Sequence, residues 1–299
     1  MKLSTSNTNA NIAIYTPIVV SNTIAVNSSS ITIGTNTIVN STAISVGSVS
    51  INSTVISTPS LFVGGTSLPL SGITSGIVNA QFFTANGTWT KPAGLTGNEQ
   101  VLIMMWGGGG AADSSASGGG GGGACVMATM PLSSLTSTCS VTVAAASVIG
   151  AAGGTSSFVV NATSTMSAYG GGAGTSTIAG GGGGTFAAAF TSTGGAPLGG
   201  AQGTTLGGPS TFGGGGGITS VSSNGGLSIF GGGGGGGNGG ITIYGGAGGS
   251  GSVNQKAGTS VFGGNGANST TVATAPGGGG GSTTNKTGAR GEVRVWVIG

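Results

Sequence analysis

The glycine runs constrain this chain more than any other feature. The stretch "GGGGGGGNGG" at 231–240 is one of many, and 59 of the 175 residues from 107 to 281 are glycine. Such segments have almost no side chains to bury. Collagen would need a strict G-X-Y period with abundant proline, whereas the runs here are irregular and this part of the chain has four prolines. Backbone groups must therefore hold these segments.

A flexible Gly/Ser linker is the main alternative, because glycine loses the most backbone freedom when it is ordered. Against a linker, an aromatic residue recurs directly before glycine runs, at Tyr169, Phe212, Phe230, Tyr244 and Phe262. We therefore predict polyglycine II helices, extended with three residues per turn, whose outward N–H and C=O groups pair with neighbouring helices. Each aromatic is expected to anchor the end of one run.

Apolar segments bracket the glycine region. "VLIMMW" at 101–106 is short and apolar enough for a buried strand. In the terminal "GEVRVWVIG", Val293, Val295 and Val297 share one face of a strand. We expect these two strands to pair and to close a β frame around the polyglycine bundle.

The two cysteines flank the turn-like "PLSSLTST". Antiparallel pairing of 123–130 with 139–148 would make Cys125 and Cys139 cross-strand neighbours, either bonded or as free thiols. Two cysteines cannot supply a four-ligand metal site alone. A catalytic role is not expected, because the chain has no histidine to accompany them.

The chain offers no recognisable set of catalytic residues. The only acids are Glu99, Asp113 and Glu292, and the glycines around Asp113 lack the Gly-Lys-Ser/Thr end of a phosphate-binding loop. We predict no catalytic residues, no metal and no cofactor.

The charges and the apolar runs also limit the partners. The six Lys and Arg residues are scattered, so nucleic-acid binding is not expected. The sequence contains no run of 18 apolar residues, so membrane insertion is not expected. Its first residues also lack the apolar core of a secretory signal peptide. We expect export by cell lysis or by an unusual route.

The N-terminal part contains a repeat of 12 or 13 residues, beginning at Asn27, Asn40 and Asn52. Apolar and small polar residues alternate within each unit, as in half-buried strands. One unit is too small to be stable alone, so units must stack on each other or on other chains. We predict the shaft of a homotrimeric fibre; a β-solenoid or an edge sheet in a monomer is the alternative.

The predicted fold class is therefore all-β with polyglycine II helices. Residues 1–63 are expected to form a β-repeat shaft or attachment region, 64–81 a connector, and 82–299 a glycine-rich module. Within the module, the strand frame is assigned to 82–148 and 290–299, and the polyglycine region to 149–289.

The order "FTANGTWTKPAG", "VLIMMWGGGG", interrupted glycine runs and "GARGEVRVWVIG" resembles the glycine-rich C-terminal modules of bacteriophage tail fibres and tail-fibre adhesins. The resemblance covers about residues 82–299, and the repeat upstream is similar to fibre shafts. It implies a polyglycine sandwich that holds variable loops against the host surface. The expected protein is then a non-catalytic structural fibre on the virion surface that projects a glycine-rich head and mediates host attachment.

That resemblance implies several partners: further copies of the chain, other virion proteins through the N-terminal region, and a host cell-surface glycan or outer-membrane protein. A self-assembling subunit of a secreted extracellular filament or sheath is the alternative. An ice-binding bundle would need regular flat faces, which the irregular run spacing does not favour.

Candidate receptor contacts come from the segments between glycine runs. Phe186 and Phe190 could contact a lipid-rich or protein receptor, or could pack on the bundle or on a neighbouring chain. Asn254, Gln255 and Lys256 offer hydrogen-bonding groups suited to a glycan, or could form a solvated turn.

Overall fold

The computed structural model describes the chain from residue 61 onward, with gaps. The described residues are 61–63, 66–68, 77–113, 118–189, 191–204, 206–218, 223–251, 254–282 and 284–299. They belong to the second of two units into which the chain divides, 58–299. The predicted shaft lies outside the described residues except for its last three.

The described residues form ten strands and one short 3₁₀ helix, so the fold is all-β as predicted. None of the described segments is a helix with the length and hydropathy of a membrane span. The elements are β1 (Leu61–Val63), β2 (Thr66–Leu68), β3 (Ile77–Phe83), β4 (Gly87–Thr90), β5 (Gln100–Trp106), β6 (Cys125–Pro131), η2 (Leu132–Ser134), β7 (Thr138–Thr142), β8 (Ser156–Asn161), β9 (Ser164–Ala168) and β10 (Glu292–Ile298).

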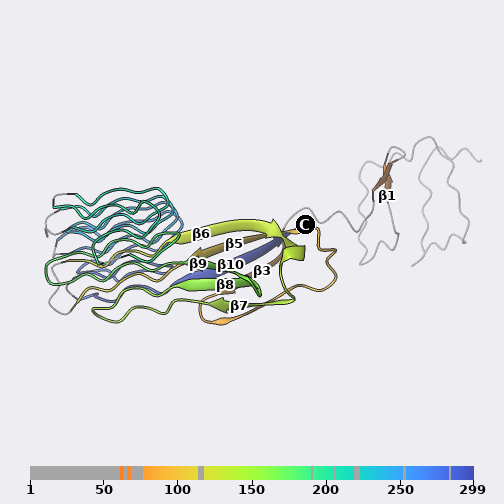
Figure 1. Ribbon diagram of the computed structural model, residues 1–299, viewed down its shortest axis with the longest axis horizontal. Coiled ribbons are helices and arrows are strands. Elements are labelled where there is room, and N and C mark those ends of the chain that lie inside the picture. The colour runs from red at the N-terminus through yellow and green to blue at the C-terminus, as the bar shows by residue number, and fades with distance from the viewer. Residues whose placement is uncertain are drawn as a thin grey trace, which may run out of the picture. The chain divides into compact units, whose positions relative to one another are not determined.

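Two four-stranded antiparallel sheets form a sandwich. Sheet one has the order β3-β10-β5-β6 and sheet two the order β4-β7-β8-β9, while β1 and β2 form a separate hairpin. The two sheets lie as layers in Figure 1. Their inner faces share one hydrophobic core, in which Ile103 and Val295 of sheet one meet Trp89 and Phe158 of sheet two, all of them fully buried. Each such side chain contributes about 1.5–3 kcal/mol by leaving water.

The predicted pairing of the bracketing strands is confirmed. β10 lies between β3 and β5, and Val295 is directly opposite Ile103. The alternation of β10 is also confirmed, because Val293, Val295 and Val297 are fully buried.

The predicted pairing of the cysteine segments is wrong. β6 pairs with β5, where Cys125 faces Trp106, whereas β7 pairs with β4, where Cys139 faces Trp89. The turn at η2 carries the chain from one sheet to the other instead of folding it back into a hairpin. Both cysteines are free and buried.

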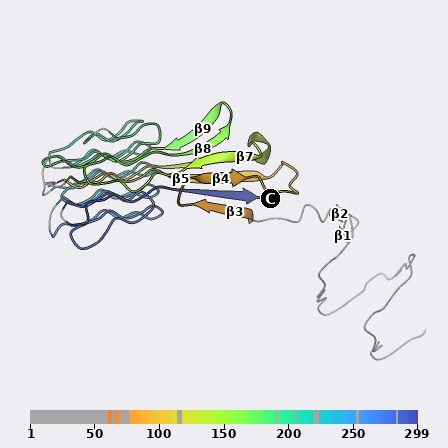
Figure 2. The same cartoon turned by 90° about the horizontal axis from the view of Figure 1, so that it is seen from below.

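The glycine segments extend from one end of the sandwich and pack side by side as a block (Figures 1 and 2). We call each extended glycine-rich segment of this block a glycine line. Backbone hydrogen bonds join each line to several neighbours. Gly120 and Gly123 donate to Gly280 and Gly277 respectively, both at 2.8 Å, while Gly121 donates to Gly172 at 3.0 Å. The intervening Gly122 donates to Gly233 at 2.8 Å. The line 119–123 thus bonds to three different segments, and it returns to the same segment after three residues.

The neighbouring lines are so close that no side chain fits between them. A Cβ on Gly122 would lie 1.8 Å from the carbonyl oxygen of Gly246, and a Cβ on Gly232 would lie 1.8 Å from that of Gly122. Real Cβ atoms do not approach oxygen atoms this closely. Neighbouring backbones are therefore too close for any residue but glycine, and this close packing explains why the chain contains long glycine runs.

The element bounds differ from the predicted ranges in several places. β3 begins at Ile77, inside the range 64–81 assigned to a connector, because the polar and small residues of "VNAQ" obscured a strand. β8 and β9 lie inside 149–289, the range assigned to polyglycine, and they complete sheet two. Conversely, the glycine lines 107–112 and 118–124 lie inside the predicted frame, each directly next to a strand of sheet one.

Replacement of Gly122 by alanine is expected to destabilise the module by about 3 kcal/mol, the upper end of typical overpacking costs, because the added Cβ overlaps a carbonyl oxygen. Denaturant unfolding of the two proteins measures this difference. Gly154→Ala is the matched control, since the nearest atom to its Cβ is 3.4 Å away. Equal stability of the two variants would contradict the packing argument.

The two thiols are expected to be unreactive in the native protein, because both are buried and burial raises the pKa of the Cys125 thiol far above its usual range. Titration with a chromogenic disulfide reagent at pH 8 checks this prediction. The native chain should give no reactive thiol and the denatured, unreduced chain two. A denatured count of zero would indicate a disulfide.

Candidate functional site

Four turns on the sandwich side of the glycine block repeat one short pattern. In each turn a Ser or Thr is followed by one β-branched residue and then by an aromatic residue, directly before the next glycine line. Ser210, Ser228, Thr242 and Ser260 occupy the same place in successive turns and are joined by parallel bridges. The turns therefore stack in register, and we call this stack the turn column (residues 209–213, 227–231, 241–245 and 259–263).

The aromatic residues of the turn column stack on one another. Ring centroids are 5.3 Å apart for Phe212 and Phe230, 4.9 Å for Phe230 and Tyr244, and 5.0 Å for Tyr244 and Phe262. The planes of each pair are within 8° of parallel. Four of the five predicted aromatics thus anchor each other, which fixes the ends of four glycine lines, whereas Tyr169 is not part of this stack. Stacked pairs of this kind add about 0.5–1.5 kcal/mol each beyond the area that they bury.

The turn column is tied to sheet one at two points. The indole Nε1 of Trp106 donates to the carbonyl oxygen of Tyr244 at 2.6 Å, and the N–H of Cys125 donates to the carbonyl oxygen of Phe230 at 2.8 Å. Trp106 ends β5 and Cys125 begins β6. The position of the turns is therefore set by the sandwich core.

An open apolar groove of about 490 Å³ runs along the turn column. Leu227 and Ile241 line it together with Ile229 and Ile243, all exposed. Three of the four hydroxyls that line the groove are already used: Ser228 donates to the carbonyl oxygen of Gly213 at 2.8 Å, Thr242 donates to that of Gly245, and Ser210 donates to that of Leu198. The groove therefore offers almost no polar group to a ligand.

A second hollow of about 500 Å³ continues from this groove, since Leu227 and Ile241 line both. Its other side chains are mostly polar and uncharged. We call it the amide hollow, and its lining residues are Asn224, Gly225, Leu227, Asn238, Gly239, Ile241, Asn254, Gln255, Lys256, Ala257 and Thr259.

A chain of hydrogen bonds orders the amide hollow. The Asn238 side chain donates through Nδ2 to Oδ1 of Asn224 at 2.8 Å, and its own Oδ1 accepts the backbone N–H of Lys256 at 2.8 Å. The N–H of Gly239 then donates to the carbonyl oxygen of Lys256 at 2.9 Å. Lys256 is held by its backbone, and its side chain is exposed. The hollow thus presents fixed amide groups with one cation at the edge.

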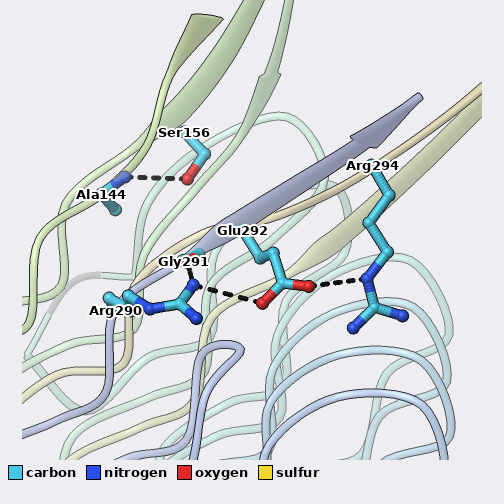
Figure 3. Close-up of polar contacts among 6 residues, drawn as sticks. All are labelled: Ala144, Ser156, Arg290, Gly291, Glu292 and Arg294. Atoms are coloured by element: carbon cyan, nitrogen blue, oxygen red, sulfur yellow. Dashed lines mark hydrogen bonds and ion pairs between the residues drawn. The ribbon is translucent and has the colours of Figure 1, made fainter. Parts of the chain in front are cut away.

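Three charged side chains cluster at the start of β10, and none of them lines the amide hollow. The Glu292 carboxylate lies between two guanidinium groups, 3.2 Å from Nη1 of Arg290 and 2.7 Å from Nε of Arg294 (Figure 3). Arg294 also lies over the Trp106 ring, 4.8 Å from its centroid. These contacts hold Trp106 against the turn column, so we assign the cluster a structural role.

The structure brings together three of the five predicted contact residues. Asn254, Gln255 and Lys256 line the amide hollow. Asn254 has a φ of 71°, a left-handed conformation in which asparagine is enriched, so its backbone also shapes the turn. Phe186 does not line the hollow; this residue is 74% exposed, and the backbone N–H of the neighbouring Thr185 donates to the carbonyl oxygen of Phe212. Phe190 lies outside the described residues.

Sequence reasoning missed Asn224 and Asn238. A signal was present in "NGGLSIF" and "NGGITIY", because the same heptad-length pattern places each asparagine at the same distance before a hydroxyl and an aromatic. In the structure this repetition becomes a parallel bridge between the two asparagines.

The chemistry of the amide hollow is that of hydrogen-bonded recognition. Amides supply both donors and acceptors, the Lys256 ammonium supplies donors only, and the flanking aliphatic side chains supply apolar contact. Across the described ranges, no cluster of His, Cys, Asp or Glu could hold a metal ion. An uncharged or weakly acidic polyol ligand matches this set of groups.

Replacement of Asn238 by alanine should break the chain of hydrogen bonds and release the backbone of Lys256. The expected result is amide hydrogen exchange at Lys256 about 3- to 10-fold faster, which corresponds to one lost hydrogen bond of about 0.5–1.5 kcal/mol. Gln202→Ala, at an exposed amide outside the hollow, is the control. Unchanged exchange at Lys256 in Asn238→Ala would refute the ordering role.

Comparison with known proteins identifies a family for this chain. A family model described as "Glycine-rich domain" matches residues 83–297, which is more than two thirds of the chain. No curated protein matches the chain at a significant level.

Proposed function

We propose that this chain, which belongs to the glycine-rich domain family, is a structural fibre protein of a phage virion, in a tail fibre or a similar appendage. Its glycine-rich head projects toward the host surface and attaches to it without catalysis. The observation that carries this proposal is the amide hollow, an ordered and nearly uncharged hollow on a block held by backbone hydrogen bonds.

Part of this proposal is that the glycine lines are polyglycine II helices. An extended helix with three residues per turn directs successive N–H groups to three neighbours and returns to the first after three residues. The bonds from Gly120 and Gly123 to one segment follow this rule, as do those from Gly180 and Gly183 to Gly119 and Gly122. Such a bundle is stiff without side chains, which suits an exposed appendage.

A rigid block favours attachment because binding then orders few additional residues. The backbone of Lys256 is already fixed by Asn238, and the ends of the glycine lines are fixed by the aromatic stack. Preorganisation of this kind lowers the entropic cost of association. The ligand best matched to the hollow is a host cell-surface glycan, with an outer-membrane protein as the second candidate.

The remaining partners follow from the resemblance of the N-terminal part to fibre shafts. The chain would associate with further copies of itself as a homotrimer and would join other virion proteins through its N-terminal region. A self-assembling subunit of a secreted extracellular filament or sheath is the competing function, and electron microscopy distinguishes the two. Discrete rods on virions support the fibre, whereas open-ended filaments would overturn it.

Attachment is tested by flow cytometry of the fluorescently labelled full-length chain on a panel of bacterial strains. For a strain that binds it, the double variant Gln255→Ala/Lys256→Ala should bind at least about tenfold more weakly, since it removes two polar groups from the hollow. Gln202→Ala should bind like the wild type. No binding to any strain from which virions carrying the protein are produced, or equal binding of the double variant, would contradict the proposed site.

A further inference from the structure

The apolar groove along the turn column plays no part in glycan attachment through the amide hollow. In each of the two central turns, a buried hydroxyl residue, Ser228 or Thr242, lies between two exposed aliphatic residues. Because side chains alternate along an extended backbone, the hydroxyl points into the block and its neighbours point out. These neighbours are between 37% and 52% exposed, and they are Leu227, Ile229, Ile241 and Ile243.

Stacking of the turns does not require these aliphatic residues. The first turn of the column has Thr211 where the central turns have isoleucine, and the last turn has Thr259 where they have Leu227 and Ile241. The same parallel bridges nevertheless join all four turns. Threonine suits an extended backbone as well as isoleucine does. The fold therefore does not explain why aliphatic side chains are exposed in the two central turns.

A smaller hollow of about 240 Å³ adjoins the groove at the first turn, since Pro209, Ser210 and Thr211 line both. We call it the Leu198 hollow, because Leu198 also lines it and is 93% exposed. The φ of Leu198 is 49°, a left-handed conformation that is rare for a bulky residue. Its carbonyl oxygen accepts the Ser210 hydroxyl at 2.8 Å, which ties this loop to the turn column. Strained residues of this kind cluster where ligands bind.

The amide hollow adjoins the same groove, because Leu227 and Ile241 line both. The amide hollow, the groove and the Leu198 hollow therefore form one continuous track. Its polarity changes along the way: amide groups and the Lys256 ammonium lie in the amide hollow, whereas aliphatic side chains dominate the groove. None of the residues that line the groove or the Leu198 hollow is charged. A ligand that fills the track needs one polar end and one apolar end.

We propose that the track binds a glycolipid-like amphiphile, with its sugar head in the amide hollow and its aliphatic chain in the groove. This inference rests on the proposed function, because it extends the glycan ligand of the amide hollow by an apolar chain. The chain covers the exposed leucine and isoleucine side chains, and this burial of apolar surface supplies free energy. The amide groups select the head through hydrogen bonds.

A sugar chain or a polypeptide matches the groove less well than a hydrocarbon does. Both would place hydroxyl or peptide groups against the aliphatic wall, where a buried polar group without a hydrogen bond costs free energy. The hydroxyls of Ser210, Ser228 and Thr242 cannot donate to such groups, because each already donates to a backbone carbonyl oxygen. A uniform aliphatic chain needs no hydrogen-bond partner, so it fits a wall that repeats aliphatic residues from turn to turn.

Isothermal titration calorimetry of the full-length chain with three probes tests this ligand class. The probes are dodecyl maltoside, maltose and dodecyltrimethylammonium, with both amphiphiles below their critical micelle concentrations. Maltose lacks the aliphatic chain, and dodecyltrimethylammonium has the same chain with a cationic head that cannot form hydrogen bonds. Dodecyl maltoside should therefore bind at least about tenfold more tightly than either of the others.

The double variant Ile229→Thr/Ile243→Thr tests the place of the aliphatic chain. Neither residue lines the amide hollow, and Thr211 at the same place in the first turn shows that the turn accommodates threonine. The variant should bind dodecyl maltoside at least about tenfold more weakly and maltose as the wild type does. Val261→Thr is the matched control, because Val261 has the same place in the last turn and is 71% exposed but does not line the groove. It should bind all three probes like the wild type.

The proposal is overturned if dodecyl maltoside does not bind, if it binds no more tightly than the other two probes, or if the double variant binds it like the wild type. The cell-binding assay separates this failure from failure of the proposed function. Attachment to cells without binding of dodecyl maltoside leaves the attachment function standing and overturns the glycolipid. Binding of dodecyl maltoside that depends on Ile229 and Ile243, with no attachment to any cell, leaves the groove ligand standing without the attachment function.

Discussion

Backbone groups of neighbouring glycine lines approach each other so closely that no Cβ fits between them, and the rest of the module depends on this contact. A Cβ on Gly122 would lie 1.8 Å from a carbonyl oxygen. Ordering a residue costs about 1–2 kcal/mol, and a net hydrogen bond returns about 0.5–1.5 kcal/mol. These terms nearly cancel, so the lines cannot be stable without an additional source of free energy at their ends.

The sandwich and the turn column supply that free energy. Large side chains such as Trp89, Ile103 and Phe158 are fully buried between the sheets, and four aromatic rings stack in the turns beside them. Trp106 joins the two parts, because it ends a core strand and donates to Tyr244. Hydrophobic burial at one end of the block thus makes hydrogen bonding possible along its whole length.

A block built in this way leaves three kinds of surface. Ser and Thr cover sheet two, asparagine and glutamine amides gather in a hollow beside Lys256, and apolar side chains remain on sheet one. With so few charges in the chain, these surfaces consist mainly of amide, hydroxyl and apolar groups. The amide hollow lies in the glycine block and the exposed apolar side chains lie on sheet one, so the two surfaces are built from different elements.

The sequence alone determined the all-β class, the pairing of the bracketing strands and the need for backbone packing, because periodicity and the absence of side chains are local properties. It also pointed to Asn254, Gln255 and Lys256. It could not place Asn224 and Asn238 beside them, since stacked turns bring together residues 14 and more positions apart. It paired Cys125 with Cys139 wrongly, because a local turn there connects two sheets. Only the tertiary structure decided which glycine lines are neighbours, for identical runs carry no side chain that could specify a partner.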